Sequence, residues 1–190
     1  MRTLERMAVI DIDGFVAGEK MHAIEHGFHV HDERHFIETY SLGQQWEVDL
    51  HPENACGGPL DLHMALEVDP RVVLAFEDRV LQDETDPEDV FHLPLHFNWV
   101  LPPLPSPPDL LVLATDLAGV ARTVLPVEVS AIDSFASVTD APQRSLAITG
   151  KVEVSIRDIY VADVHLCDVL DRCKEISEFL LEQAPAWLST

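Results

Sequence analysis

The residues with the clearest chemical potential stand near the start of the chain, where five of its ten histidines lie between positions 22 and 35. Histidine is a common metal ligand and the one side chain whose charge changes near neutral pH without a perturbing environment. Carboxylates are interleaved with the imidazoles in this segment. The cluster consists of His22, His26, His29, His31 and His35, with Glu25, Asp32 and Glu33 among them.

The spacing of three of these histidines predicts a metal site. His29 and His31 share a face if the chain is extended, and His35 lies one helical turn beyond His31 if a helix starts there. A strand-to-helix junction would bring the three imidazoles together, with Asp32 or Glu38 as a fourth ligand or as a carboxylate that orients a ring. Zinc or another divalent transition metal would suit this set; otherwise we expect no cofactor. The alternative interpretation is a solvated histidine-rich face.

A second candidate is the run Val9-Ile10-Asp11-Ile12-Asp13-Gly14. It resembles the first motif of the haloacid-dehalogenase-type phosphatases, in which one aspartate attacks phosphorus and the other handles the leaving-group proton. The resemblance implies Asp11 as the nucleophile and Asp13 as the acid/base. The residue after the glycine is Phe15, where that family has threonine or valine. The middle of the chain also alternates like an antiparallel sheet, without strand–helix–strand units.

Three cysteines form an odd set without the density of a disulfide framework, so we expect a reduced, cytoplasmic protein. Cys167 and Cys173 fall within a predicted helix and are interpreted as packing residues. Cys56 lies near His51 and Glu53, which are suitable partners for a nucleophile, but Gly57-Gly58 alone is a weak oxyanion signal. No catalytic residue is assigned from the sequence.

The charge balance limits the classes of partner. The chain has 34 acidic and 12 basic side chains, a formal net charge of -22 at pH 7. Such a surface repels phosphate backbones and anionic lipid head groups, so we expect neither nucleic acid nor membrane as a partner. No apolar run approaches the ~18 residues of a membrane span. A protein partner, a homo-oligomer or an apolar small molecule remains open.

The elements that must position these residues are predicted from hydrophobic periodicity. Alternation of apolar and polar residues predicts strands, and Pro94 indicates a sheet edge or bulge. We expect a hairpin whose return strand is Val72 to Leu81. The other predicted strands are Ala8 to Ile12, Leu62 to Val68, Phe91 to Leu101, Leu110 to Ala114, a segment near Val120 to Ile132, and Leu146 to Val164 with a bend near Asp158.

Helical periodicity is clearest at the end of the chain, where apolar residues recur at three- and four-residue steps from Leu166 to Trp187. Shorter helices are predicted for Glu19 to Ile24 and Asp32 to Tyr40. The fold class is therefore α+β, with a curved antiparallel sheet of five or more strands covered by the C-terminal helix. Residues 1–58 form a mixed segment packed on residues 59–190, most simply as one domain.

This order of elements is similar to that of helix-grip lipid-binding folds and of SecB-like export chaperones, in topology alone. The leading hypothesis is a soluble, non-catalytic binding or assembly protein, with a protein partner or an apolar ligand held between sheet and helix. The first alternative is a metal-dependent hydrolase-type enzyme that uses the cluster from His22 to His35. The second alternative is a phosphatase that uses Asp11 and Asp13.

Overall fold

In the computed structural model of this protein, the described residues are 10–82, 87–135 and 142–189. The helices are α1 (Ile12–Glu25), α2 (Pro70–Leu81), α3 (Leu110–Ala121), α4 (Ile156–Val161) and α5 (Cys167–Leu188), with the short 3-10 helix η1 (Glu53–Ala55). The strands are β1 (Phe28–Ile37), β2 (Gln44–Pro52), β3 (Asp61–Val68), β4 (His92–Val100), β5 (Val127–Ser134) and β6 (Gln143–Ser155).

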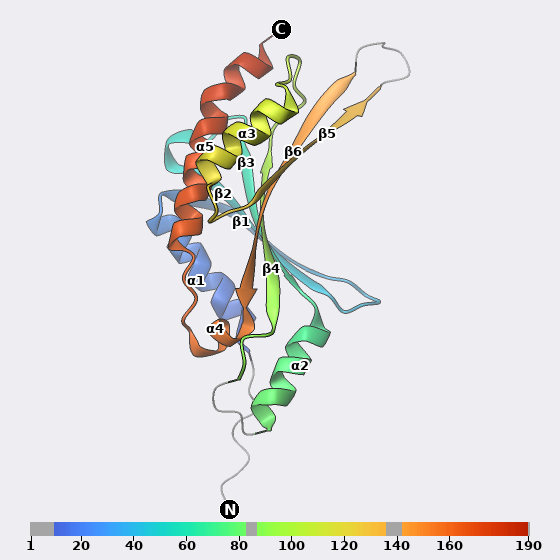
Figure 1. Ribbon diagram of the computed structural model, residues 1–190, viewed down its shortest axis with the longest axis vertical. Helices are drawn as coiled ribbons and strands as arrows, with labels where there is room; N and C mark the ends of the chain where they lie inside the picture. Colours follow the sequence, from blue (N-terminus) through green and yellow to red (C-terminus); the bar gives the residue numbers. More distant parts are fainter. Residues whose placement is uncertain (1–9, 83–86, 136–141, 190) are drawn as a thin grey trace, which may run out of the picture.

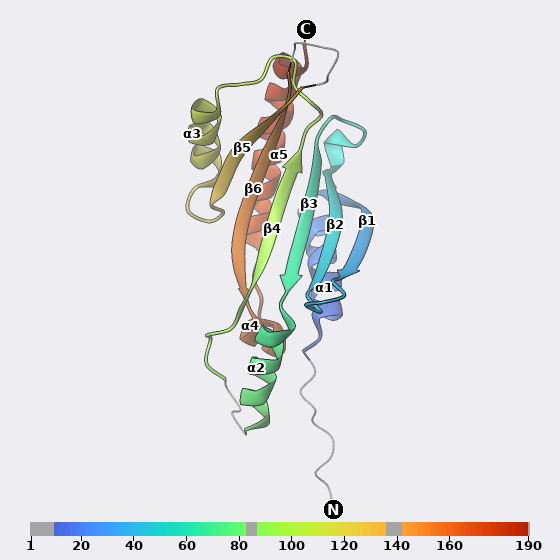
Figure 2. The same ribbon diagram turned by 90° about the vertical axis from the view of Figure 1, so that its right-hand side faces the viewer.

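The six strands form one antiparallel sheet in the order β1-β2-β3-β4-β6-β5, which confirms the predicted α+β class. Helices α1, α3, α4 and α5 lie on one side of the twisted sheet, whereas α2 extends from the end of β3 (Figure 1). The view at right angles shows the opposite face of the strands uncovered over much of its area (Figure 2). One face of the sheet is therefore a core face and the other is open.

The core lies between the sheet and α5. Alternate residues of β4 are buried, and so is one stripe of α5, which confirms the predicted C-terminal amphipathic helix. Within this interface the indole Nε1 of Trp99 donates a 2.9 Å hydrogen bond to Ser177 Oγ, so the polar group of each side chain has a partner. The buried residues of the two elements include Leu93, Leu95, Phe97 and Trp99 of β4 and Leu170, Cys173, Ile176 and Leu180 of α5.

Two segments predicted as strands are helices, so those predictions are wrong. Val72 to Leu81 belongs to α2, and Leu110 to Ala114 begins α3. Each helix starts after an aspartate, Asp69 or Asp109, whose carboxylate accepts backbone N–H groups of the first turn. Such N-caps satisfy donors that have no partner inside the helix, and Pro70 suits the first helical position. The capping signal outweighs the β-branched and alternating residues that follow it.

The other boundaries agree with the predictions more closely. Helix α1 contains the predicted helical stretch Glu19 to Ile24. The long segment Leu146 to Val164 divides into β6 and α4 near the predicted bend. Pro94 lies just past the last β3–β4 pair, Leu66 with Leu95, where β4 has only β6 opposite it. The predicted strand Ala8 to Ile12 is wrong over its described part, because residues 10 and 11 belong to no strand and Ile12 opens α1; residues 8 and 9 lie outside the described residues.

The segment Asp32 to Tyr40, predicted to be helical, instead forms most of β1, so that prediction is wrong. Strand β1 pairs with β2 along its whole length, and the register shifts between Val30 and Asp32, which leaves His31 as an extra, bulged residue. Cross-strand pairing supplies hydrogen bonds that the local helical signal of Asp32 and Glu33 cannot offset.

The strands of residues 1–58 belong to the same sheet as those of 59–190, and the buried apolar residues form one cluster that runs from Ile10 to Trp187. In the described parts of the chain, no helix combines the length and apolar character that a membrane crossing requires.

Candidate metal centre

The β-bulge in β1 determines which histidines share a face. Paired residues of neighbouring antiparallel strands point to the same side of a sheet. His29 pairs with His51 on the open face, and Val30 pairs with Leu50 on the core face. His31 is the bulged residue between these pairs and the pair Asp32–Asp49. Its ring turns to the open side, where its centroid lies 4.4 Å from that of His51.

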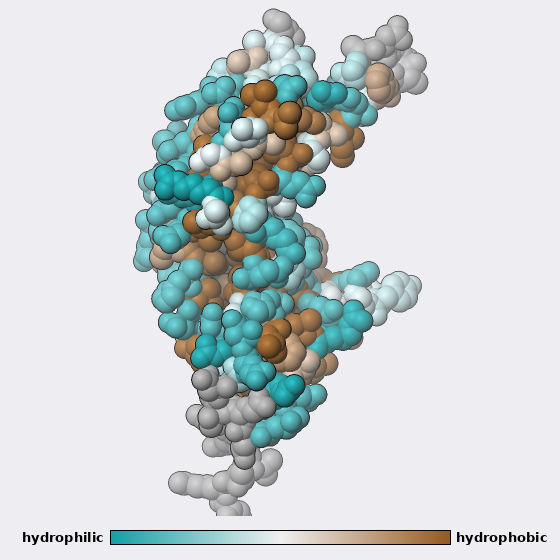
Figure 3. Space-filling view, in the orientation of Figure 1, coloured by the Kyte–Doolittle hydropathy of each residue, from teal (hydrophilic) through white to brown (hydrophobic). Residues whose placement is uncertain are grey.

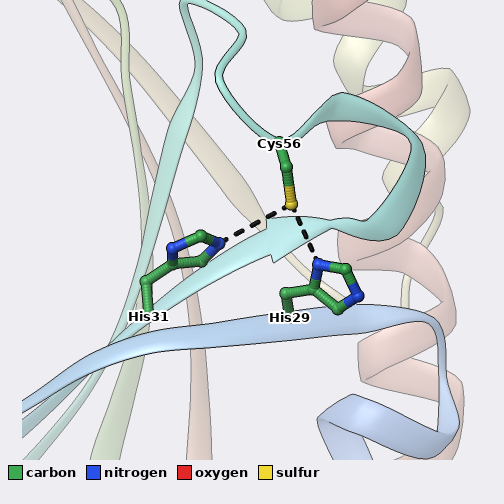
Figure 4. A group of neighbouring side chains, drawn as sticks. All are labelled: His29, His31 and Cys56. Atoms are coloured by element: carbon green, nitrogen blue, oxygen red, sulfur yellow. Dashed lines mark hydrogen bonds between the residues drawn. The ribbon is translucent and has the colours of Figure 1, made fainter.

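Cys56 completes a group of three potential ligands. It follows η1, the single turn that redirects the chain after β2. Its Sγ lies 2.9 Å from His29 Nδ1 and 3.6 Å from His31 Nε2, and the three donor atoms lie within 4.8 Å of one another. Both imidazoles point from β1 toward the sulfur atom (Figure 4). All three residues are exposed.

These separations suit a tetrahedral metal ion. With Zn–S and Zn–N bonds of about 2.3 and 2.05 Å, tetrahedral geometry places sulfur and nitrogen about 3.5 Å apart. The distance from Cys56 to His31, 3.6 Å, is already at that value, whereas the distance to His29, 2.9 Å, is that of a hydrogen bond. A small rotation of the exposed His29 ring would accommodate an ion, because nothing buried has to move.

His51 lies beside this group and is half-buried. Burial, and after it the nearby His31, lowers the pKa of His51 below the ordinary histidine value, so its neutral form is favoured. Its Nε2 lies 3.2 Å from Asp61 Oδ1, whereas its Nδ1 is buried without a hydrogen-bond partner. A neutral ring against His31 keeps positive charge away from the place where a cation would sit.

The structure brings together two of the three predicted ligands, His29 and His31, but not His35. Because the bulge reverses the alternation of β1, His35 pairs with Trp46 on the core side and stacks on its ring at a centroid distance of 3.9 Å. The other members of the cluster also lie elsewhere: His26 Nδ1 is 2.7 Å from Asp171 of α5, and His22 follows Glu19 on α1. Cys56 takes the place predicted for His35.

A second group with suitable atoms lies on the open face, formed by Glu47, Asp49 and His63. Here the guanidinium of Arg34 lies 2.5 Å from Glu47 and 2.6 Å from Asp49, and His63 Nδ1 lies 2.5 Å from Asp49. The hydrogen bond that Arg34 donates to Glu47 is the main cause that raises the pKa of Arg34. Since a fixed positive charge already occupies this group, it is a poorer cation site than His29, His31 and Cys56.

The two aspartates of the phosphatase-like motif have structural partners. Asp11 is the N-cap of α1 and accepts the backbone N–H of Gly14 at 2.8 Å. Asp13 accepts the indole N–H of Trp46 at 2.9 Å. Among the described strands every pairing is antiparallel, so the sheet differs from the strand–helix–strand context of that motif.

Comparisons with models of protein families, with curated proteins and with solved structures found no match to this chain. The candidate centre therefore rests on the chain's own geometry: two imidazoles from a bulged edge strand and one thiol from the turn that follows its partner strand.

Proposed function

We propose that this chain is a non-catalytic binding protein, and that one of its ligands is a single transition-metal ion of the zinc type. The ligands are His29 Nδ1, His31 Nε2 and Cys56 Sγ. The observation that carries the proposal is the mutual approach of these three donor atoms, all within 4.8 Å, from two separate segments. Imidazole and thiolate are the donors that zinc prefers, and the net charge of -22 favours cations in general.

The proposal is for binding because three carboxylates of the neighbouring strands β2 and β3 are already engaged in ion pairs. Glu47 and Asp49 contact Arg34, and Asp61 contacts His51. Three protein ligands do leave a fourth position for water, which is the arrangement of catalytic zinc sites. Zinc-dependent turnover of a simple activated ester, lost in Cys56→Ser, would replace the binding proposal with hydrolysis.

The test is the metal content of untagged protein, dialysed and then loaded with Zn²⁺. We expect about one zinc per chain, consistent with a single three-ligand site. His29→Ala and Cys56→Ser should each lose it. His35→Ala and Cys167→Ser are matched controls, because they alter the same residue types outside the group, and both should retain the metal. Cobalt loading should give a sulfur-to-cobalt charge-transfer band. This band should disappear in Cys56→Ser and persist in Cys167→Ser.

Zinc retained by both His29→Ala and Cys56→Ser would overturn the proposal, since the ion would then lie elsewhere. Loss of zinc in His63→Ala but not in Cys56→Ser would assign it to the group around Asp49. The melting temperature of each variant should be measured without metal, so that loss of the fold is not mistaken for loss of a ligand.

A second candidate function, self-assembly, is favoured by a different observation. Helix α3 has one charged residue, Asp116, among its twelve, and apolar side chains gather over it on the surface (Figure 3). Leu111 is 77% and Val112 58% exposed on α3, and Ile132 of the edge strand β5, which pairs with Ser145 on the open face of the sheet, is 68% exposed. A chain of such high net charge repels its own copies least where charges are fewest. We infer that a second copy pairs its β5 with β5 of the first across a two-fold axis, so that it covers α3 on one face of the sheet and Ile132 on the other.

Sedimentation velocity tests this second candidate. We expect a dimer at tens of micromolar protein, and a monomer for the double variant Leu111→Glu with Ile132→Lys. Leu74→Glu is the matched control, because Leu74 is 58% exposed on α2, away from β5, and its variant should remain dimeric. A monomer at all concentrations in the unaltered protein would dismiss this interface.

A further inference from the structure

Cys56 differs from the other two cysteines in its exposure and in its imidazole neighbours, which bear on the reactivity of its thiol as well as on metal binding. Cys173 is fully buried, and burial raises the pKa of its thiol well above the ordinary value. Cys167 is exposed at the start of α5, and in the described residues no imidazole bonds to it. Cys56 is exposed and also has imidazole nitrogens at 2.9 and 3.6 Å from its sulfur. It alone combines access with a neighbouring base.

Cys56 also borders a hollow that the two imidazoles do not line. A hollow of about 690 Å³ opens between the turn after β2 and α5, and Cys56 is one of its lining residues. The remaining lining comes from Asn54, Ala55, Gly57, Gly58, Glu178, Leu181 and Glu182. The imidazoles belong to β1, outside this lining. A small neutral molecule in this hollow would therefore lie next to Cys56 without contacting His29 or His31.

We propose that Cys56 is an oxidation site for small hydroperoxides, and that its oxidation releases the metal from His29, His31 and Cys56. The inference rests on the proposed metal-binding function and adds regulation of that function by oxidation. A thiolate is both the metal ligand and the nucleophile of thiol chemistry, so one sulfur atom cannot serve both roles at once. Metal loading and oxidation then exclude one another.

The reaction balances without a further reductant. Sulfur attacks the distal oxygen of the hydroperoxide, so that an S–O bond forms as the O–O bond breaks. His29 Nδ1 accepts the thiol proton and passes it to the departing oxygen, which leaves as water or an alcohol. The sulfur loses two electrons and the peroxide gains them. The product, a sulfenic acid, is reversible and lacks the thiolate that binds zinc strongly.

The experiment uses the full-length, zinc-loaded protein and hydrogen peroxide, with a chromogenic chelator to report free zinc and dimedone to trap sulfenic acid. We expect peroxide to release the bound zinc and a thiol reductant to restore binding. Mass spectrometry should find the dimedone adduct at Cys56 about tenfold more than at Cys167, since both are exposed but only Cys56 has an imidazole. In metal-free His29→Ala, the adduct at Cys56 should form about tenfold more slowly, with the rate at Cys167 unchanged.

The outcomes separate the two proposals. If the protein holds no zinc before peroxide is added, both the metal-binding function and its regulation by oxidation are overturned. If zinc is bound by the unaltered protein and lost in Cys56→Ser, but the unaltered protein retains it after peroxide, only the regulation by oxidation is overturned. Equal labelling of Cys56 and Cys167 in metal-free protein also overturns it, because the imidazoles would then give Cys56 no advantage. His35→Ala should behave like the unaltered protein throughout.

Discussion

Among single residues, His31 is the one on which the candidate metal centre depends most. It has no partner residue on β2, and its ring lies between Cys56 Sγ and the ring of His51. Neither imidazole of the group has a carboxylate that fixes its orientation among the described hydrogen bonds. Orienting partners of this kind usually account for 10–100-fold in metal affinity. We therefore expect zinc affinity below that of closed structural sites.

Glu19 gives a prediction that concerns stability alone. This side chain on α1 is 3% exposed, and its Oε2 is buried without a hydrogen-bond partner. Burial is the main cause that raises the pKa of Glu19, with His22 opposing it from 3.5 Å. Because the folded-state pKa lies above the unfolded one, the group's contribution to the free energy of unfolding is fully present below the unfolded pKa. It is lost as the pH rises through the folded pKa.

Glu19→Gln removes this buried charge at neutral pH. We expect the free energy of unfolding at pH 7 to rise by about 1 kcal/mol, because a neutral amide costs less to desolvate than a carboxylate in the same place. Urea unfolding at pH 4.5 and at pH 7 measures it, and the gain should be larger at pH 7. Glu25→Gln is the control, since Glu25 is exposed on the same helix. A Glu19→Gln protein less stable than the original at pH 7 would contradict the argument.

At the level of elements, the bulge in β1 separates what the sequence could predict of the site from what it could not. The spacing of His29 and His31 was enough to predict that they share a face. The exclusion of His35 depends on one extra residue, because a single bulge moves every later side chain of the strand to the opposite face. No local signal in the segment marks that position. The approach of Cys56 depends on how η1 turns, which also lies beyond spacing arguments.

The same contrast holds for the fold. The strand from Phe91 to Leu101 and the helix from Leu166 to Trp187 have long, regular apolar patterns, and both were predicted correctly. Helices α2 and α3 were mistaken for strands because both contain β-branched residues close to a turn signal. The aspartates before them, Asp69 and Asp109, were available as capping signals. Asp69 followed by Pro70 fits the hairpin turn that the prediction requires before Val72, and it fits the start of a helix equally well.

Deletion of His31 tests the role of the bulge directly. Removing the extra residue restores regular alternation, with Val30 still opposite Leu50 and Asp32 still opposite Asp49. We therefore expect the free energy of unfolding to stay within about 1 kcal/mol of the original, since the strand pairing survives intact. Zinc binding should be lost. Thermal unfolding and metal content measure the two effects.

His31→Ala is the matched variant, because it keeps the bulge and removes the ligand. It should lose zinc as the deletion does. If the deletion unfolds the protein while His31→Ala folds, the bulge is required for the sheet itself. The hypothesis that the bulge serves only to position a metal ligand is then refuted.

At the level of the whole molecule, the net charge of -22 gives a surface that attracts cations and repels anions. The open face is polar and carries local charge pairs, such as Arg34 with Glu47 and Asp49. Such pairs can neutralise at most 12 of the 34 carboxylates, because the chain has only 12 lysines and arginines, and an excess of 22 negative charges remains. The remaining carboxylates repel one another in the folded state, where they are closer together than in the unfolded chain.

Salt should therefore stabilise this protein. The Debye length falls from about 30 Å at 0.01 M to about 10 Å at 0.1 M monovalent salt, which screens repulsion across the molecule but spares contacts such as that of Arg34 with Asp49. We expect the melting temperature in metal-free buffer to rise by several degrees between these concentrations. Since sodium and potassium chloride screen equally, both salts should give the same rise. A melting temperature that falls with salt would mean that attractive surface pairs outweigh the net charge.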